Sequence, residues 1–135
     1  MSLDPVLNFA KCAVSVGYGS GDTTIILSGG YGVRLPDPAT DGAFNLVWWN
    51  STDYSDPSDD PYREIIRCTA RSTDTLTIVR AQEGTMATSK NIGGETYLMA
   101  LTLTKKMMTD IDAAITYLNN HQLVYDSDYR CYLGI

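Results

Sequence analysis

Short runs rich in β-branched and apolar residues, separated by turn residues, fill the first hundred positions of the chain. Glycine, proline, asparagine and aspartate bound these runs, and they interrupt strands through their backbone preferences. The first two runs enclose a glycine-rich turn at residues 17–22, so we expect them to pair as a hairpin. We expect strands at residues 11–16, 23–27, 44–50, 62–70, 75–79 and 96–101.

The pattern changes to a helical period after residue 104. Residues 105–119 contain no glycine or proline, Thr104 is a suitable N-cap, and Asn119–Asn120 is the expected end of the helix. Apolar residues recur there at spacings of three, four and three, which places them on one stripe. Two heptads do not hold an isolated helix in water, so the stripe must be buried on the sheet or on another subunit. We predict an oligomer interface at Met108, Ile111, Ile115 and Leu118.

Together these elements predict a mainly β fold, either an antiparallel β-sandwich or a partly open barrel, with one C-terminal α-helix. The strand–helix alternation of a doubly wound sheet is absent. A chain of 135 residues is large enough for one core. We assign residues 1–103 to the β domain and residues 104–135 to a helix and tail that serve oligomerisation or attachment.

The charge of the chain limits its partners. The net charge is −6, and such a chain is repelled by DNA, RNA and anionic lipid. No apolar run approaches the roughly 18 residues of a membrane span, and the first residues lack the pattern of a signal peptide. We therefore expect no nucleic-acid partner and no membrane association.

No cluster of residues in the sequence matches a cofactor or metal motif. Cys12 and Cys68 lie in strand-like runs and are interpreted as core residues. Four aspartates in the loop at residues 51–61 could supply oxygen ligands for Ca²⁺, but their spacing misses the calcium-loop pattern and suits ordinary turns. These aspartates are Asp53, Asp56, Asp59 and Asp60. We expect no metal and no cofactor.

The sequence also lacks a pattern for catalysis. His121 is the single histidine, and no nucleophile motif accompanies it. The glycine-rich run at residues 29–32 is not followed by the lysine and helix of a phosphate loop, so a turn with a positive φ is the better interpretation. We expect that the protein is not an enzyme.

Trp48 and Trp49 are adjacent in a predicted strand, so their side chains point to opposite faces. One ring can lie in the core. The other is then either a partner contact, where tryptophan is enriched, or is covered by the helix or a loop. Both interpretations stay open, and we name Trp48 and Trp49 as a hypothetical partner contact.

The segment that follows the fifth predicted strand has the features of a structural turn. Arg80 can reach a neighbouring carboxylate, Gln82 and Glu83 can bond to loop backbone, and Gly84 is expected at a positive φ. A contact site at Arg80, Gln82, Glu83 and Gly84 is the alternative, and we favour the structural interpretation.

Several segments of the chain resemble a small domain that recurs in structural proteins of tailed bacteriophages and prophages. The resemblance covers roughly residues 12–112, and its most specific part is Arg-Ala-Gln-Glu-Gly-Thr at residues 80–85, preceded by Thr-Leu-Thr at residues 75–77. It also includes the glycine-led turn at residues 19–24 and the run from Leu46 to Tyr54. Residues 86–91 depart from the alanines and histidine that often follow in that family.

The resemblance implies a tail, baseplate or tail-fibre component that assembles through protein–protein contacts and has no catalytic residues. We expect a homo-oligomer, with a trimer favoured and a hexameric ring as the alternative. It would bind other virion proteins and be located in the virion, and in the host cytoplasm during assembly. The alternative is a host-surface carbohydrate-binding module, in which the tyrosines and aspartates at residues 53–62 would contact sugar.

Overall fold

The computed structural model describes the backbone of residues 3–132 and the side chains of residues 3–121. The chain divides into two compact units. One unit spans residues 4–102 and contains the β-strands, and the other contains the C-terminal helix. The two units are described separately below.

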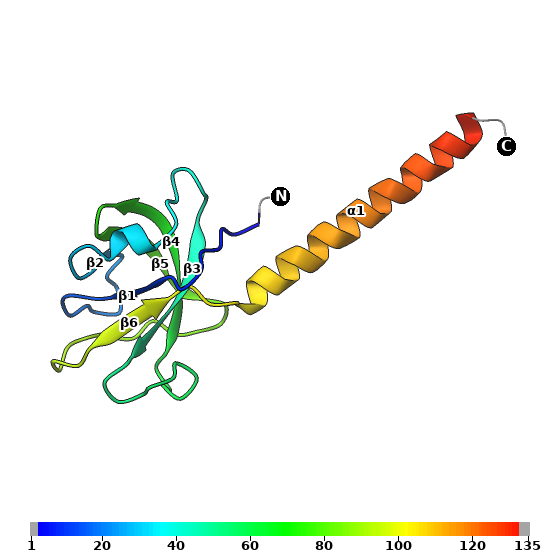
Figure 1. Ribbon diagram of the computed structural model, residues 1–135. Helices are drawn as coiled ribbons and strands as arrows, with labels where there is room; N and C mark the ends of the chain where they lie inside the picture. Colours follow the sequence, from blue (N-terminus) through cyan, green and yellow to red (C-terminus); the bar gives the residue numbers. More distant parts are fainter. Residues whose placement is uncertain (1–2, 133–135) are drawn as a thin grey trace. The chain divides into compact units, whose positions relative to one another are not determined.

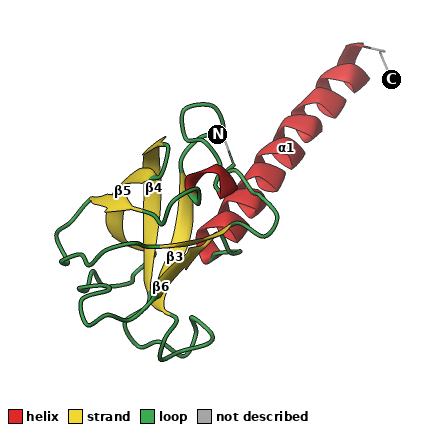
Figure 2. Ribbon diagram, turned by 60° about the vertical axis from the view of Figure 1, so that its left-hand side comes forward, coloured by secondary structure: helices red, strands yellow, loops and turns green. Residues whose placement is uncertain are grey.

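The strands of the first unit form one six-stranded antiparallel sheet that curls on itself (Figures 1 and 2). The order across the sheet is β1-β6-β3-β4-β5-β2, so the strands nearest to each other in sequence are not always neighbours. A short 3₁₀ helix, Gly32–Arg34, follows β2. The strands are β1 (Lys11–Ala13), β2 (Thr24–Ile26), β3 (Phe44–Asn50), β4 (Glu64–Ser72), β5 (Thr75–Gln82) and β6 (Tyr97–Ala100).

The predicted hairpin between the first two strands is wrong, because β1 pairs with β6 and β2 pairs with β5. The two edge strands still meet just beyond their ends, where Val14 and Leu27 form an isolated antiparallel bridge. Backbone bonds from Ser15 N to Ile26 O (3.2 Å) and from Ser28 N to Ala13 O (2.8 Å) flank this bridge. The curled sheet is therefore a partly open barrel, one of the two predicted architectures.

The concave side of this sheet holds the hydrophobic core. Alternate residues of a strand point to the same face, so the inward positions of all six strands converge. Phe44, Leu46 and Trp48 supply this face of the central strand β3. The rest of the core comprises Ala10, Cys12, Val14, Tyr18, Ile25, Leu27, Leu35, Ile66, Cys68, Leu76, Ile78 and Met99.

The second unit contains α1, which spans Lys105–Tyr132. The predicted start is confirmed, because the N–H of Met107 donates to Oγ1 of Thr104 at 3.5 Å. The predicted end at Asn119–Asn120 is wrong: the helix continues for twelve residues beyond Asn120. Asparagine lowers helix propensity only slightly, and no glycine or proline stops the backbone ladder before Tyr132. Within the described residues, no helix has the length and apolar character needed to cross a membrane.

Candidate functional site

The segment from Arg80 to Thr85 begins with a β-bulge between β4 and β5. Arg67 pairs with Val79 and Ile65 pairs with Gln82, so β5 carries one residue more than β4 over this stretch. Ala81 has φ 55° and Gly84 has φ +80°. The prediction of a positive φ at Gly84 is confirmed, and the bulge explains why β5 extends past Val79.

The Arg80 side chain points into the barrel and pairs with Glu64. Its Nε donates to Glu64 Oε1 at 2.8 Å and its Nη2 to Glu64 Oε2 at 2.7 Å. The remaining donors reach the backbone oxygens of Gly19, Asp22 and Thr88 at 2.7–3.1 Å. The prediction that Arg80 pairs with a carboxylate is confirmed, and this one guanidinium ties three segments to β5.

Glu64 is the centre of a buried charge cluster, which we define as Glu64, Arg80 and Lys90. Glu64 is fully buried, and its Oε1 also accepts the N–H of Ala81 at 2.9 Å. The carboxylate thus satisfies a backbone donor in the bulge as well as the guanidinium of Arg80. Buried charges persist when they are paired and hydrogen-bonded in this way.

Lys90, from the loop before β6, completes the cluster on the other side of Glu64. Its Nζ lies 3.8 Å from Glu64 Oε2, donates to Thr88 Oγ1 at 2.7 Å, and donates to the carbonyl oxygen of Tyr62. The side chain is fully buried, and burial lowers the pKa of Lys90 to about 8, against the attraction of Glu64. The Arg80 guanidinium lies 5.1 Å, and the Lys90 nitrogen 5.9 Å, from the centre of the Trp48 ring.

The cluster is enclosed within the barrel. The Glu64 and Lys90 side chains have no exposed surface, and the Arg80 side chain is 7% exposed. Sequence reasoning missed Glu64 and Lys90. The sequence held one signal for Glu64, which is a charged residue at an inward position of a strand where polar and apolar residues otherwise alternate. A charge at such a position needs a buried partner.

The other residues of the turn bond partly within it and partly to β3 and β4. Gln82 Nε2 donates to the carbonyl oxygen of Arg80 at 2.9 Å, as expected. Glu83 instead accepts a bond from a side chain, Nδ2 of Asn45, at 2.7 Å. Oγ1 of Thr85 accepts the N–H of Ile65 at 3.0 Å and donates to Gln82 O at 2.8 Å. These bonds fix the loop to β4, as the structural interpretation requires.

Both tryptophans are buried, with exposed fractions of 0% for Trp48 and 5% for Trp49. Trp48 lies in the core and meets Tyr18 edge-on, with ring centroids 6.0 Å apart. Trp49 is on the opposite face, where its Nε1 donates to the carbonyl oxygen of Tyr54 at 3.3 Å. The partner contact proposed for Trp48 and Trp49 is therefore contradicted, because the loop after β3 covers the second ring.

Three of the four aspartates of that loop accept bonds from the loop or its ends. Asp53 accepts a bond from Asn50 Nδ2 at 2.7 Å, and Asp56 accepts the N–H of Ser58 at 2.8 Å. Asp60 is buried and accepts two backbone N–H groups, those of Asn50 and Tyr62, at 2.9 and 2.8 Å. These are ordinary turn bonds. Among the described residues, no group of three or more His, Cys, Asp or Glu is arranged to hold a metal ion.

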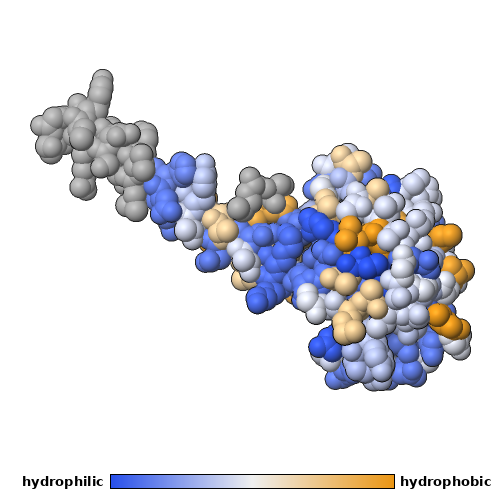
Figure 3. All heavy atoms as spheres, turned by 180° about the vertical axis from the view of Figure 1, so that it is seen from behind, coloured by the Kyte–Doolittle hydropathy of each residue, from blue (hydrophilic) through white to orange (hydrophobic). Residues whose placement is uncertain are grey.

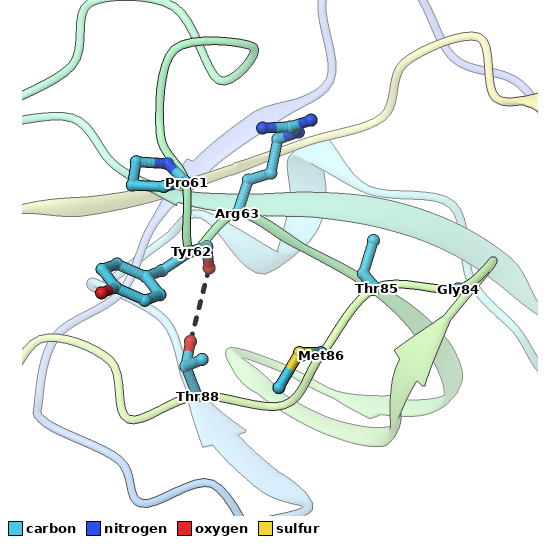
Figure 4. A pocket seen from close by; sticks show the side chains of 7 residues that line it. All are labelled: Pro61, Tyr62, Arg63, Gly84, Thr85, Met86 and Thr88. Carbon is cyan, nitrogen blue, oxygen red and sulfur yellow. Dashed lines mark hydrogen bonds between the residues drawn. The ribbon is translucent and has the colours of Figure 1, made fainter.

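A shallow pocket of about 320 Å³ lies between the segment before β4 and the loop after β5. Figure 4 shows Tyr62 on one side of it and Met86 on the other, with Thr88 Oγ1 donating to Tyr62 O at 3.3 Å. Tyr62 is 65% exposed and Met86 is 75% exposed. The pocket is lined by Pro61, Tyr62, Arg63, Gly84, Thr85, Met86 and Thr88.

The predicted stripe on α1 is exposed. The exposed fractions are 50% for Met108, 37% for Ile111, 52% for Ile115 and 63% for Leu118. Figure 3 shows apolar positions within the hydrophilic surface of the helix. Four large apolar side chains on one stripe are a surface suited to contact with another chain.

His121 lies on the surface of α1, and Cys12 and Cys68 lie in the core. His121 is exposed, and its Nδ1 lies 2.9 Å from the carbonyl oxygen of Tyr117, one helical turn earlier. Cys12 and Cys68 are free and buried, and burial raises the pKa of Cys12 to about 12 and of Cys68 to about 11. Such thiols are unreactive core residues.

Comparison of the chain with models of known protein families and with curated proteins found no match.

Proposed function

We propose that this protein is a non-enzymatic structural component of a tailed-phage virion that acts through protein–protein assembly. It would serve in the tail, the baseplate or fibre attachment, and its partners would be other copies of itself and other virion proteins. The observation that carries the proposal is the exposed apolar stripe of α1, at Met108, Ile111, Ile115 and Leu118.

The stripe gives a driving force for assembly. Full burial of one such side chain contributes about 1.5–3 kcal/mol relative to its exposed state. An isolated helix is only marginally stable in water, so contact between helices would also stabilise α1 itself. Identical chains that share a contact surface form closed symmetric rings by default, and the resemblance to fibre-attachment proteins favours a trimer.

The β domain supports a scaffold role for the same protein. Its charged residues at Glu64, Arg80 and Lys90 are enclosed and satisfied inside the barrel, where they brace loops and bulges. A rigid barrel of this kind can hold loops for contact with neighbouring virion proteins.

The test is the molar mass of the full chain in solution by light scattering. The wild type is expected to be oligomeric at micromolar concentration, and Ile111→Asp with Ile115→Asp is expected to be monomeric. The matched control is Thr116→Asp with Asn120→Asp, which adds the same charges four residues apart at exposed positions off the stripe. A monomeric wild type, or equal loss of mass in the control, would contradict the proposal.

A carbohydrate-binding module is the second candidate. The observation in its favour is Tyr62, a largely exposed aromatic residue beside the pocket. A glycan array with the wild type and with Tyr62→Ala tests it. Binding that is lost in Tyr62→Ala would favour this candidate over a purely structural role.

A further inference from the structure

The pocket beside Tyr62 carries a cation at its edge. Arg63 is exposed, and its Nη1 donates to the carbonyl oxygens of Ser58 and Asp60 at 3.3 and 3.0 Å. Within the described part of the chain, its Nε and Nη2 donate to no acceptor, and the guanidinium pairs with no carboxylate. The acidic loop before β4 thus presents backbone oxygens to Arg63, and one edge of the guanidinium is available to an anionic ligand.

Several oxygen atoms of the lining residues are already hydrogen-bonded within the protein. The carbonyl oxygen of Tyr62 accepts bonds from Lys90 Nζ and from Thr88 Oγ1. Thr88 Oγ1 also accepts a bond from Lys90 at 2.7 Å, and the carbonyl oxygen of Thr88 accepts one from Arg80 at 2.7 Å. The Thr85 hydroxyl donates its proton within the turn at 2.8 Å. These atoms are therefore poor acceptors for a ligand that brings N–H donors.

The same bonds brace the wall of the pocket. Lys90 and Arg80 belong to the buried charge cluster, and they hold Tyr62 and Thr88 from inside the barrel. A wall that is fixed before the ligand arrives loses little conformational entropy on binding, so even a small ligand can be held by few contacts.

The lining residues offer donors in place of acceptors. The backbone N–H groups of Gly84 and Met86 donate to no acceptor among the described residues. The free edge of Arg63 adds further donors and a positive charge. Such a pocket is complementary to a ligand that is rich in acceptor atoms and negatively charged, and a planar carboxylate matches the fork of an arginine side chain.

The apolar part of the pocket suits a single sugar ring. Tyr62 and Met86 are largely exposed, and Figure 4 shows them on opposite sides of the pocket. An exposed aromatic ring can cover the apolar C–H face of a sugar while its hydroxyl stays in water. The volume of about 320 Å³ lies at the lower end of the range for small-molecule sites, roughly 300–1,000 Å³, which leaves room for one ring.

We propose that this pocket binds a carboxylated sugar residue, such as a uronic acid unit of a polysaccharide. The sugar ring lies between Tyr62 and Met86, and its carboxylate accepts bonds from Arg63. The inference deepens the carbohydrate-binding candidate and rests on it, because it names the ligand class of the same pocket. It does not depend on assembly through α1.

An acidic peptide is the competing source of a carboxylate. Its backbone N–H groups would also need acceptors, and the carbonyl oxygens of Tyr62 and Thr88 are already occupied. The hydroxyl groups of a sugar act as acceptors as well as donors, and those that find no partner remain in water because the pocket is shallow. The hydrogen-bonding capacity of the pocket therefore favours the sugar.

The first experiment titrates the isotope-labelled full chain with pairs of methyl glycosides by NMR. The members of each pair differ only at the carboxylate: methyl glucuronide with methyl glucoside, and methyl galacturonide with methyl galactoside. The carboxylated member of at least one pair is expected to bind about tenfold more tightly than its neutral partner, a factor worth about 1.4 kcal/mol. Shifts of the backbone N–H signals of Gly84 and Met86 locate the site.

The second experiment repeats the titration with variants. Arg63→Gln is expected to abolish the preference for the carboxylated member, and Tyr62→Ala to abolish binding of both members. The matched controls are Arg34→Gln, which removes an exposed guanidinium outside the pocket, and Tyr62→Phe, which keeps the ring. Both controls are expected to keep the preference. Fluorescence of the buried tryptophans reports whether each variant is folded, and the wild-type comparison does not depend on any variant.

The outcomes separate this inference from the proposals above. No binding of either carboxylated sugar, or equal affinity for both members of each pair, overturns it. Equal affinity that Tyr62→Ala abolishes would leave a neutral-carbohydrate site intact. Tighter binding of N-acetylglutamate amide than of the sugars would show that the site takes an acidic peptide. Arg63→Gln and Tyr62→Ala should keep the wild-type molar mass in light scattering, so assembly is judged independently.

Discussion

Glu64 and Arg80 face each other from neighbouring strands as a two-bond ion pair inside the barrel, with N–O distances of 2.8 and 2.7 Å. The bulge in β5 makes this possible, because the extra residue changes the register beside Glu64 and leaves the N–H of Ala81 free to bond to the carboxylate. A local irregularity of the sheet and a buried charge therefore stabilise each other.

Glu64→Gln should strongly destabilise the protein. It leaves the guanidinium of Arg80 buried without its counter-charge, a change that costs about 3–5 kcal/mol. Urea denaturation followed by tryptophan fluorescence measures the loss. Asp110→Asn, which breaks the Lys106–Asp110 pair on the surface of α1, is the control and should cost under about 0.5 kcal/mol. A similar small cost for Glu64→Gln would show that the cluster is dispensable.

Gly84→Ala should lower stability through the backbone alone. Gly84 has φ +80°, and the space around its Cα would admit a Cβ without a contact within 4 Å. The expected cost is about 1–2 kcal/mol, which lowers the melting temperature by several degrees. Gly21→Ala is the control, since Gly21 has open space and no positive φ. Glu83→Gln should lower the melting temperature less than Gly84→Ala does. If Gly84→Ala kept full stability but lost binding to a virion partner, the segment would be a contact site.

Lys90 should make stability rise with pH in the alkaline range. Its pKa falls from 10.5 to about 8 on folding because of burial, so between these values the unfolded chain binds more protons than the folded one. The free-energy cost of burying the protonated amine applies in full below about pH 8. It falls as the pH rises towards 10.5, because the folded protein then holds a neutral Lys90. The difference in unfolding free energy between wild type and Lys90→Met should grow in favour of the wild type, by at most about 3 kcal/mol. The two buried thiols occur in both proteins and cancel in this difference. If the difference in unfolding free energy between wild type and Lys90→Met stayed constant from about pH 7.5 to 10, a depressed pKa at Lys90 would be excluded.

Cys12 and Cys68 should resist thiol reagents in the folded protein. Burial raises the pKa of both thiols to about 11–12, so at pH 8 they are protonated and inaccessible. In a Cys131→Ser variant, a disulfide-exchange reagent should detect no thiol in buffer and two in denaturant. Fast reaction of either thiol in the native state would mean that the barrel opens readily.

Local pattern was enough for some elements. The run at residues 44–50 was predicted with the bounds that β3 has, because an apolar strand flanked by turn residues is defined by its own composition. The start of α1 was predicted from Thr104 for a similar reason, since a cap is a local bond. The positive φ of Gly84 was also predicted from local sequence, because it is a property of that residue's own backbone.

Tertiary structure decided which strands are neighbours and which side chains are covered. Pairing of β1 with β6 joins residues nearly ninety positions apart, whereas the sequence favoured the nearer partner. The burial of Trp49 depends on where the loop after β3 folds, and alternation in the strand says only that the ring faces away from the core.

The sequence by itself determined the elements, their faces and the class of the fold, because these depend on residues close together in the chain. The tertiary structure alone decided the strand order, the partners of Glu64 and Lys90, and the length of α1. The physical reason is that burial and pairing arise between distant segments, and a linear pattern specifies what each segment can contribute but not which other segment it will meet.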